Sequence, residues 1–254
     1  QDLTAVRLTE RMRADFIANA SHELRSPLAS LVGFIETLKG PAKGDAEARE
    51  RFLDIMHTEA ARMARLIDDL LSLSRVEIEE RVPPRDAVDL ALVIRGAIDL
   101  LSIRAGERNV ALELDCPAGI PAVLGDADQL AQVFRNLIEN AVRYGRADGR
   151  VLVSLRAVER IPERGVPGVA ATIADEGEGI PPDALPRLTE RFFRVDKARS
   201  KALGSTGIGL AIVKHIVGRH RGRLAIESAP GQGSRFTVFI PSVPPGAAAA
   251  AEFP

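Results

Sequence analysis

Apolar residues in the first third of the chain recur with the spacing of packed helices. From Ile17 to Leu38 they step by three or four residues with a mean of 3.5, and from Phe52 to Leu73 the same mean returns, with polar Glu59 inside the repeat. The segment "KGPAKGD" (39–45) separates the two repeats with two glycines and a proline. The pattern predicts an antiparallel helical hairpin. Each apolar stripe is too long to be covered by one partner helix, so we expect two hairpins to form a dimeric four-helix bundle.

The pattern changes after the proline-containing segment "ERVPPRDAVDL" (80–90). Helical spacing is found near 90–104, 127–143 and 208–220, and strand-like spacing at 110–115, 151–158, 169–175, 224–228 and 235–240. The fold class expected is therefore α plus α/β, with the hairpin followed by an α/β sandwich of one helical layer on a mixed sheet. The predicted organisation is a hairpin over 1–79, a linker over 80–87, a second domain over 88–242 and a disordered tail over 243–254.

Composition narrows the function classes. The 254 residues carry a formal net charge of −1, which does not favour a general nucleic-acid or acidic-lipid surface. Cys116 is the single cysteine, so an internal disulfide is excluded and a reducing compartment is favoured. No apolar run of about 18 residues and no signal peptide occur. Because Gln1 is not a natural initiator, we expect a fragment, with any membrane segment in the part that precedes it.

The stretch "SHELRSPLAS" (21–30) places a histidine beside a glutamate in the first helix. If Leu24 lies on the apolar seam, His22 faces solvent and Ser26, one turn on, shares its face. An exposed helical histidine is most often ordinary surface. Here, however, Pro27 inside the helix costs about 3 kcal/mol and is expected to bend the helix just beyond the histidine. Neutral imidazole is a good nucleophile, and Glu23 can hold one ring N–H, so His22 is a candidate nucleophile.

A second polar stripe interrupts "FRNLIENAVRYG" (134–145). Asn136, Glu139, Asn140 and Arg143 fall on one helical face, opposite apolar positions that can face a core. One interpretation is a solvated helix face. The other is a Mg²⁺ site, in which amide oxygens complement waters and phosphate oxygens.

Two glycine-rich segments add candidate ligand contacts. In "IADEGEGIP" (173–181) the glycines either form a plain turn or let the backbone approach a flat ligand. Asp175 could then accept a hydrogen bond from an exocyclic amine of that ligand. In "GSTGIGLAIVKHIV" (204–217) three glycines run into an amphipathic helix, which predicts a phosphate cradle at its N-terminus. This segment fits neither a Walker loop nor the dinucleotide fingerprint. The charged residues 182–206 between the two segments are either a mobile lid or a plain surface loop.

In this order, the motifs resemble those of the sensor histidine kinases of two-component signalling. "SHELRSPL" is similar to their H box, "RNLIENAVRYG" to the N box, "DEGEGIP" to the first glycine box, "ERFFRVD" to the F box, "GSTGIGLAIVK" to the second glycine box, and "PGQGSRF" (230–236) to the short closing motif. The wording of "FIANASHELRSPLASLVGFIETL" and "LPRLTERFFRVDKARS" resembles the phosphate-regulon sensor subgroup.

The resemblance implies a dimeric bundle followed by an ATP-binding domain of the histidine kinase, gyrase and chaperone type. His22 would be autophosphorylated from ATP and would pass the phosphoryl group to an aspartate of a response regulator receiver domain, with Glu23 as the activating acid. Ser26 stands where threonine is usual but keeps the hydroxyl, which leaves regulator phosphatase activity open. The implied protein is a homodimer with no nucleic-acid partner, the cytoplasmic portion of an inner-membrane-anchored sensor.

The same resemblance assigns a nucleotide site. Mg²⁺ would be held by Asn140 and Asn136, and the adenine would be read by Asp175. The further residues implied in ATP binding are Arg143, Tyr144, Gly177, Gly179, Ile180, Arg194, Thr206, Gly207, Gly209 and Leu210. Glu176 replaces a usual asparagine and Ser205 a usual glycine.

Two other classes compete with the kinase interpretation. One is an ATPase of the same nucleotide-binding fold, as in chaperones and topoisomerases, which leaves the His–Glu hairpin unexplained. The other is a non-catalytic dimerisation scaffold that binds ATP, which the presence of His22, Glu23 and Asn140 disfavours.

Overall fold

The computed structural model describes residues 3–79, 83–196 and 204–243. They form two compact units, one up to Leu71 together with Gly204–Thr206, the other from Ser72 onward. None of the helices in these described ranges is long and apolar enough to span a membrane.

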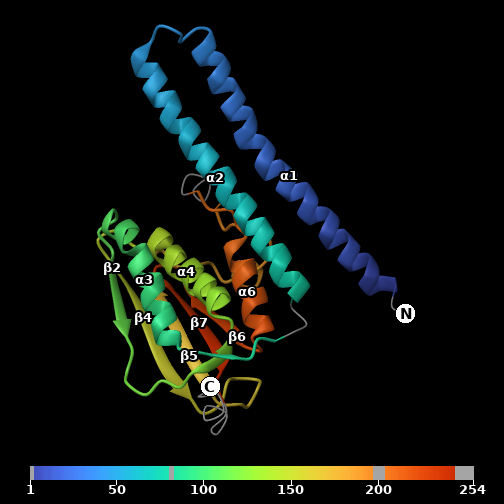
Figure 1. The fold of residues 1–254 in the computed structure, drawn as a ribbon, viewed down its shortest axis with the longest axis vertical. Helices are drawn as coiled ribbons and strands as arrows, with labels where there is room; N and C mark the ends of the chain where they lie inside the picture. The colour runs from blue at the N-terminus through green and yellow to red at the C-terminus, as the bar shows by residue number, and fades with distance from the viewer. Residues whose placement is uncertain (1–2, 80–82, 197–203, 244–254) are drawn as a thin grey trace, which may run out of the picture. The chain divides into compact units, whose positions relative to one another are not determined.

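The first unit is built from two long helices, α1 (Leu3–Lys39) and α2 (Ala46–Glu79), of which the last residues of α2 belong to the second unit. Both helices are joined by a tight turn, so that they run antiparallel (Figure 1). In the turn the Gly40 N–H donates to the Glu36 carbonyl at 3.0 Å. The Asp45 carboxylate then caps the start of α2 by accepting from the Ala48 N–H at 2.9 Å. The predicted hairpin is confirmed.

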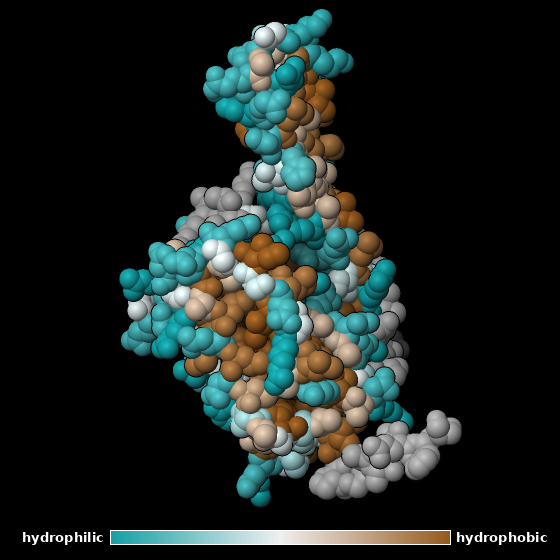
Figure 2. All heavy atoms as spheres, turned by 60° about the vertical axis from the view of Figure 1, so that its left-hand side comes forward, coloured by the Kyte–Doolittle hydropathy of each residue, from teal (hydrophilic) through white to brown (hydrophobic). Residues whose placement is uncertain are grey.

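The apolar residues of the hairpin divide between two faces. Pro27 is buried within α1, which continues through it, and the rings of Phe34 and Phe52 pack with centroids 5.2 Å apart across the hairpin. Other large apolar side chains remain exposed: Leu28, Val32, Ile35, Leu53, Ile55, Ile67 and Leu71. Figure 2 shows hydrophobic side chains along one flank of the hairpin, in the upper part of the view. The hairpin therefore carries more apolar surface than its two helices cover.

The second unit is a five-stranded mixed sheet covered by helices. In spatial order the strands are β2 (Ala111–Asp115), β4 (Arg150–Val158), β5 (Gly168–Asp175), β7 (Ser234–Pro241) and β6 (Arg223–Ser228). β2 and β4 pair in parallel and the other neighbours pair antiparallel. The helices α3 (Leu90–Gly106), α4 (Ala127–Tyr144) and α6 (Gly209–Arg219) form one layer on this sheet (Figure 1). The predicted α/β sandwich is confirmed.

Smaller elements complete the unit. The short strand β1 (Asp86–Val88) pairs antiparallel with β3 (Val123–Gly125), so the end of the expected linker 80–87 is taken up by a strand. A 3₁₀ turn, η1 (Leu185–Arg187), follows the first glycine segment. The Val243 N–H donates to the Ala122 carbonyl at 2.8 Å. The rest of the expected disordered tail, 244–254, lies outside the described residues.

Helix α4 is the centre of the second unit. Its apolar face is buried, and it packs against α3 on one side and α6 on the other. Asp126 caps its N-terminus by accepting from the Gln129 N–H at 3.1 Å. Because the core fixes the rotation of α4, its polar stripe is held in a defined direction.

Candidate functional site

His22 lies on the exposed surface of α1, as the apolar repeat predicts. Ser26, one turn further on, is exposed as well. Residues four apart on a helix lie on the same face, so the imidazole and the hydroxyl are accessible to the same partner.

Glu23 is held by an arginine that sequence reasoning missed. Arg62 Nη2 of α2 lies 3.1 Å from Glu23 Oε2, and Arg62 Nη1 lies 3.6 Å from Glu59 Oε2. Arg62 is only 7% exposed, so the two carboxylates compensate a largely buried guanidinium. This contact explains the polar Glu59 inside the α2 repeat, the one signal by which Arg62 could have been found. It also holds the Glu23 carboxylate against α2, one residue along the chain from the histidine.

The polar stripe of α4 lies where the sequence predicted it. Asn136, Asn140, Arg143 and Tyr144 are half-buried, whereas the intervening apolar residues face the core. The Asn136 amide lies against the start of α6, its Nδ2 donating to the Gly209 carbonyl at 3.5 Å. The amide stripe and the second glycine segment are thus brought together, although 73 residues separate Asn136 from Gly209.

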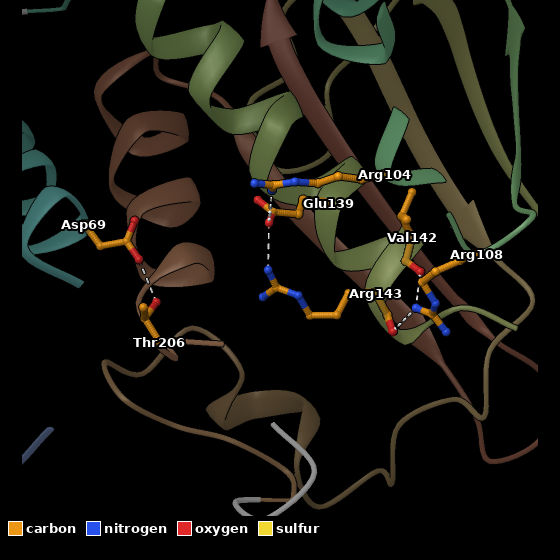
Figure 3. Close-up of polar contacts among 7 residues, drawn as sticks. All are labelled: Asp69, Arg104, Arg108, Glu139, Val142, Arg143 and Thr206. Atoms are coloured by element: carbon orange, nitrogen blue, oxygen red, sulfur yellow. Dashed lines mark hydrogen bonds and ion pairs between the residues drawn. The ribbon is translucent and has the colours of Figure 1, made fainter. Parts of the chain in front are cut away.

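Arg143 is paired through Glu139 with a residue of α3. Glu139 Oε1 accepts from Arg143 Nη2 at 2.7 Å and from Arg104 Nη1 at 2.8 Å. Figure 3 shows the carboxylate between the two guanidinium groups. Neither the pairing nor Arg104 was predicted, because a stripe on one helix says nothing about the neighbouring helix.

Arg108, one turn after Arg104, satisfies the C-terminal end of α4. Its guanidinium donates to the carbonyls of Val142 and Arg143, and its Nη2 to the Gly145 carbonyl at 3.3 Å (Figure 3). A cation at a helix C-terminus meets carbonyls that lack helical partners and the negative end of the helix dipole. Arg108 therefore holds the turn that carries Tyr144.

Asp175 ends β5 beside this turn. Its Oδ1 accepts from the Gly177 N–H at 2.8 Å, and burial raises the pKa of the carboxyl while hydrogen bonds from the Gly177 and Ser234 N–H groups act in the opposite direction. A Cβ on Gly177 would lie 2.5 Å from the Tyr144 carbonyl oxygen, so only glycine allows this approach. The turn with Asp175 and Gly177 therefore lies against the backbone carbonyl of Tyr144.

The closing motif supports the first glycine segment. Gly179 has a φ of +71°, and a Cβ there would lie 1.9 Å from the Ala229 carbonyl oxygen. The Ile180 N–H donates to Ser228 Oγ at 2.9 Å, and Ser228 Oγ donates to the Gly233 carbonyl at 2.7 Å. The supporting role of Ser228 was not predicted, since it lies just before the recognised motif.

The second glycine segment leads into a helix without a side-chain cap. Ile208 is the N-cap of α6 and supplies no side-chain hydrogen bond, whereas Asp126 caps α4. Gly209 and Leu210 form the first turn, and the Gly207 carbonyl accepts from the Phe192 N–H at 2.8 Å. The N-terminus of a helix suits an anion, because its first N–H groups have no acceptor within the helix itself.

The remaining predicted residues lie at the ends of the segment between the glycine motifs. Thr206 is buried and belongs to the first unit, where its hydroxyl donates to Asp69 at 2.6 Å. Arg194 is half-buried. The centre of the expected lid, 197–203, lies outside the described residues.

A buried histidine joins α6 to the start of α4. His220 is 3% exposed, and its Nε2 accepts from the Asp126 N–H at 3.0 Å while Nδ1 lies 2.8 Å from the Ile216 carbonyl. These contacts suit one neutral tautomer, with the proton on Nδ1. Burial lowers the pKa of His220 below its ordinary value.

This histidine predicts an acid-sensitive fold. The native state binds fewer protons at His220 than the unfolded state, so stability is intact above about pH 6.5 and declines as the pH falls below it. The slope from this one group reaches at most about 1.4 kcal/mol per pH unit. Urea unfolding followed by circular dichroism between pH 5 and 8 should show the decline, and the His220→Gln variant should show a flatter profile. Parallel profiles for both proteins would contradict the assignment.

Two protein-family models match parts of the chain. Residues 12–79 match the family described as "His Kinase A (phospho-acceptor) domain". Residues 125–244 match the family described as "Histidine kinase-, DNA gyrase B-, and HSP90-like ATPase". The chain belongs to the sensor histidine kinases.

Two curated relatives extend along nearly the whole chain. The phosphate regulon sensor protein PhoR of Pseudomonas aeruginosa is 41% identical over 247 residues, which cover 95% of this chain and 53% of PhoR. The sensor-like histidine kinase SenX3 of Mycolicibacterium smegmatis is 40% identical over 235 residues, covering 92% of this chain and 59% of SenX3. The chain thus spans between half and three-fifths of these relatives. The expected likeness to phosphate-regulon sensors is confirmed.

Solved histidine kinases share the fold. The Acinetobacter baumannii kinase AdeS aligns with a TM-score of 0.66 and 26% identity, covering 87% of this chain and 98% of AdeS. The full-length kinase ShkA, solved in complex with AMPPNP, aligns with a TM-score of 0.63 and 26% identity, covering 92% of this chain and 46% of ShkA.

Proposed function

We propose that this chain is an ATP-dependent protein histidine kinase that phosphorylates His22 and passes the phosphoryl group to an aspartate of a response regulator. The proposal rests on the observation that each of the two units carries a different candidate site. One unit carries an exposed histidine, followed in the chain by a carboxylate that Arg62 holds. On the other unit Asn136 contacts the start of α6, and the turn with Asp175 and Gly177 lies against the C-terminal end of α4, the helix that carries Asn136. The complex of ShkA with AMPPNP supports a nucleotide at the second site.

The residues of the second unit would bind and orient ATP. The Asp175 carboxylate would accept a hydrogen bond from the adenine amine, with Tyr144 beside the base, and the N–H groups at the start of α6 would donate to phosphate oxygens. Arg143 and Arg194 would neutralise phosphate charge. Phosphoryl transfer from ATP requires little covalent chemistry from the protein. The protein's main contributions are therefore to orient the reacting groups and to neutralise the phosphate charge.

A Mg²⁺ ion would fit the same site. Asn140 and Asn136 offer amide oxygens, hard donors that suit an ion which keeps waters and phosphate oxygens as its other ligands. In the described part of the chain no three His, Cys, Asp or Glu side chains gather into a cation site, so these amides carry the assignment. When bound, Mg²⁺ would neutralise phosphate charge.

His22 supplies the nucleophile. One ring nitrogen attacks the γ-phosphorus of ATP, the bond to the β–γ bridging oxygen breaks, and ADP leaves. The Glu23 carboxylate, anchored by Arg62, stabilises the imidazolium that forms. Because His22 is exposed, the phosphohistidine can next be reached by a regulator's aspartate. The exposed Ser26 hydroxyl on the same face would serve regulator dephosphorylation.

Labelled ATP tests the proposal directly. Incubation of the full chain with γ-labelled ATP and Mg²⁺ should place acid-labile, alkali-stable label on the protein, and a receiver domain should then remove it. Phosphate release without protein-bound label would instead indicate an ATPase of the same fold. Nucleotide binding with neither label nor hydrolysis would indicate a scaffold.

The uncovered apolar flank of the hairpin indicates a homodimer. A seam residue such as Ile35 would be buried between protomers, where an unpaired carboxylate costs several kcal/mol. We therefore expect a fragment of residues 10–75 to sediment as a dimer at micromolar concentration and its Ile35→Glu variant as a monomer. Ser30→Glu, on the opposite face of α1, is the matched control and should stay dimeric. A monomeric parent fragment, or a dimeric Ile35→Glu variant, would contradict this interface.

A further inference from the structure

Arg104 and Glu139 surround a residue of the proposed nucleotide site without belonging to it. A single carboxylate oxygen, Glu139 Oε1, accepts from both Arg143 and Arg104 (Figure 3). The side chains of Glu139 and Arg143 are 23% and 18% exposed, whereas that of Arg104 is 53% exposed. The negative charge of Glu139 therefore has two cationic partners, the half-buried Arg143 and the solvent-exposed Arg104.

Arg143 points along the same face of α4 as the amides. It lies seven residues after Asn136, about two helical turns, and Asn136 contacts the first residue of α6. A phosphate bound at the α6 N-terminus would compete with Glu139 for the Arg143 guanidinium, since both are oxygen anions that form charge-assisted hydrogen bonds.

Losing Arg143 would be costly for Glu139 if no other cation were present. A mostly buried carboxylate that loses its partner retains its desolvation penalty. Arg104 already contacts the same oxygen, so Glu139 remains compensated when Arg143 leaves it. The pair thus lowers the cost of transferring Arg143 from protein to ligand.

We propose that Glu139 and Arg104 form a positioning pair that restrains Arg143 in the absence of nucleotide and releases it to the nucleotide phosphates. The proposal rests on the proposed function, because it takes Arg143 as a phosphate contact. It assigns opposite effects to two residues in direct contact. Removing the Glu139 charge should strengthen phosphate-dependent binding, and removing Arg104 should weaken it.

Calorimetry with ADP and with adenosine on the full chain tests both directions. Glu139→Gln should bind ADP about two- to fivefold more tightly, and Arg104→Gln about two- to fivefold more weakly, as expected for partly exposed ion pairs. Adenosine affinity should be unchanged in both, because it lacks the phosphates. Arg95→Gln is the matched control, since it removes the same charge from an exposed position of α3; its ADP affinity should equal that of the parent.

A double variant distinguishes an effect of Arg104 that acts through Glu139 from a direct effect of the Arg104 charge on the phosphates. With Glu139 already neutral, Arg104→Gln should have no further effect on ADP. An equal loss in both backgrounds, or weaker ADP binding by Glu139→Gln, would overturn the proposal. Loss of adenosine binding in either variant would overturn it as well, because it would show that the pair supports the folded structure of the site. Failure of the parent chain to bind ADP and adenosine would instead overturn the proposed function.

Discussion

The His22→Gln variant is expected to lose autophosphorylation completely while its affinity for ATP stays within about twofold of the parent. Glutamine keeps a polar side chain of similar length but has no nitrogen that can accept a phosphoryl group. The side chain is exposed on α1, so the substitution removes no core contact. Exposed surface changes of this kind usually alter stability by less than about 0.5 kcal/mol. Labelled ATP for the chemistry and calorimetry with the ATP analogue AMPPNP for binding give the two readouts.

His57 offers the matched control. It is exposed on α2 of the same hairpin, and His57→Gln should be labelled like the parent chain. Label that persists in the His22 variant would place the phosphorylated residue elsewhere. Label lost equally from both variants would show that the hairpin, rather than one nucleophile, had been damaged.

The apolar repeats predict the hairpin, but they do not predict which apolar residues are buried inside it and which remain exposed. Leu28 and Leu31 belong to one repeat with a mean step of 3.5, yet Leu28 is 52% exposed whereas Leu31 is half-buried. A stripe this wide can pack against the neighbouring helix and against a second surface at the same time. Periodicity predicts which face of the helix is apolar, but it does not predict what covers each part of that face. The division between the two is visible only when α2 is in place.

Contacts between distant segments explain the other residues that sequence reasoning missed. Arg62 meets Glu23 across 39 residues, and Arg104 meets Glu139 across 35. Neither arginine follows a motif, because an ion pair requires only opposite charges at neighbouring positions of the folded chain. The motif residues, in contrast, could be found because glycines at tight approaches and amides at i and i+4 leave a local pattern.

Short strands were missed for a different reason. β1 and β3 have three residues each, too few for alternation to be distinguished from a linker. Their pairing places Gly125 just before the cap of α4, so the missed element helps to position the helix that carries the amide stripe.

The Asp175→Asn variant is expected to bind ATP about ten- to a hundredfold more weakly, with a much smaller effect on GTP. Oδ1 of Asp175 already accepts from the Gly177 N–H, and the carboxylate has further lone pairs with which to accept from the adenine amine. In asparagine one position can keep the bond to Gly177, and the other becomes an NH₂ group that faces the amine as a second donor. Loss of one charge-assisted bond in a partly buried site costs about 1.5–3 kcal/mol, which gives the expected range.

Two further variants separate base recognition from support of the loop. Asp175→Ala removes the Gly177 bond as well, so it should weaken ATP and GTP together and lower the melting temperature, whereas Asp175→Asn should melt close to the parent. Asn140→Asp, on the amide face of α4, should change the Mg²⁺ dependence of binding and leave the preference for adenine intact. Calorimetry with both nucleotides and a melting curve for each variant give the comparison. Equal loss of ATP and GTP in Asp175→Asn would mean that the carboxylate supports the turn at Gly177 and that adenine is recognised by another group.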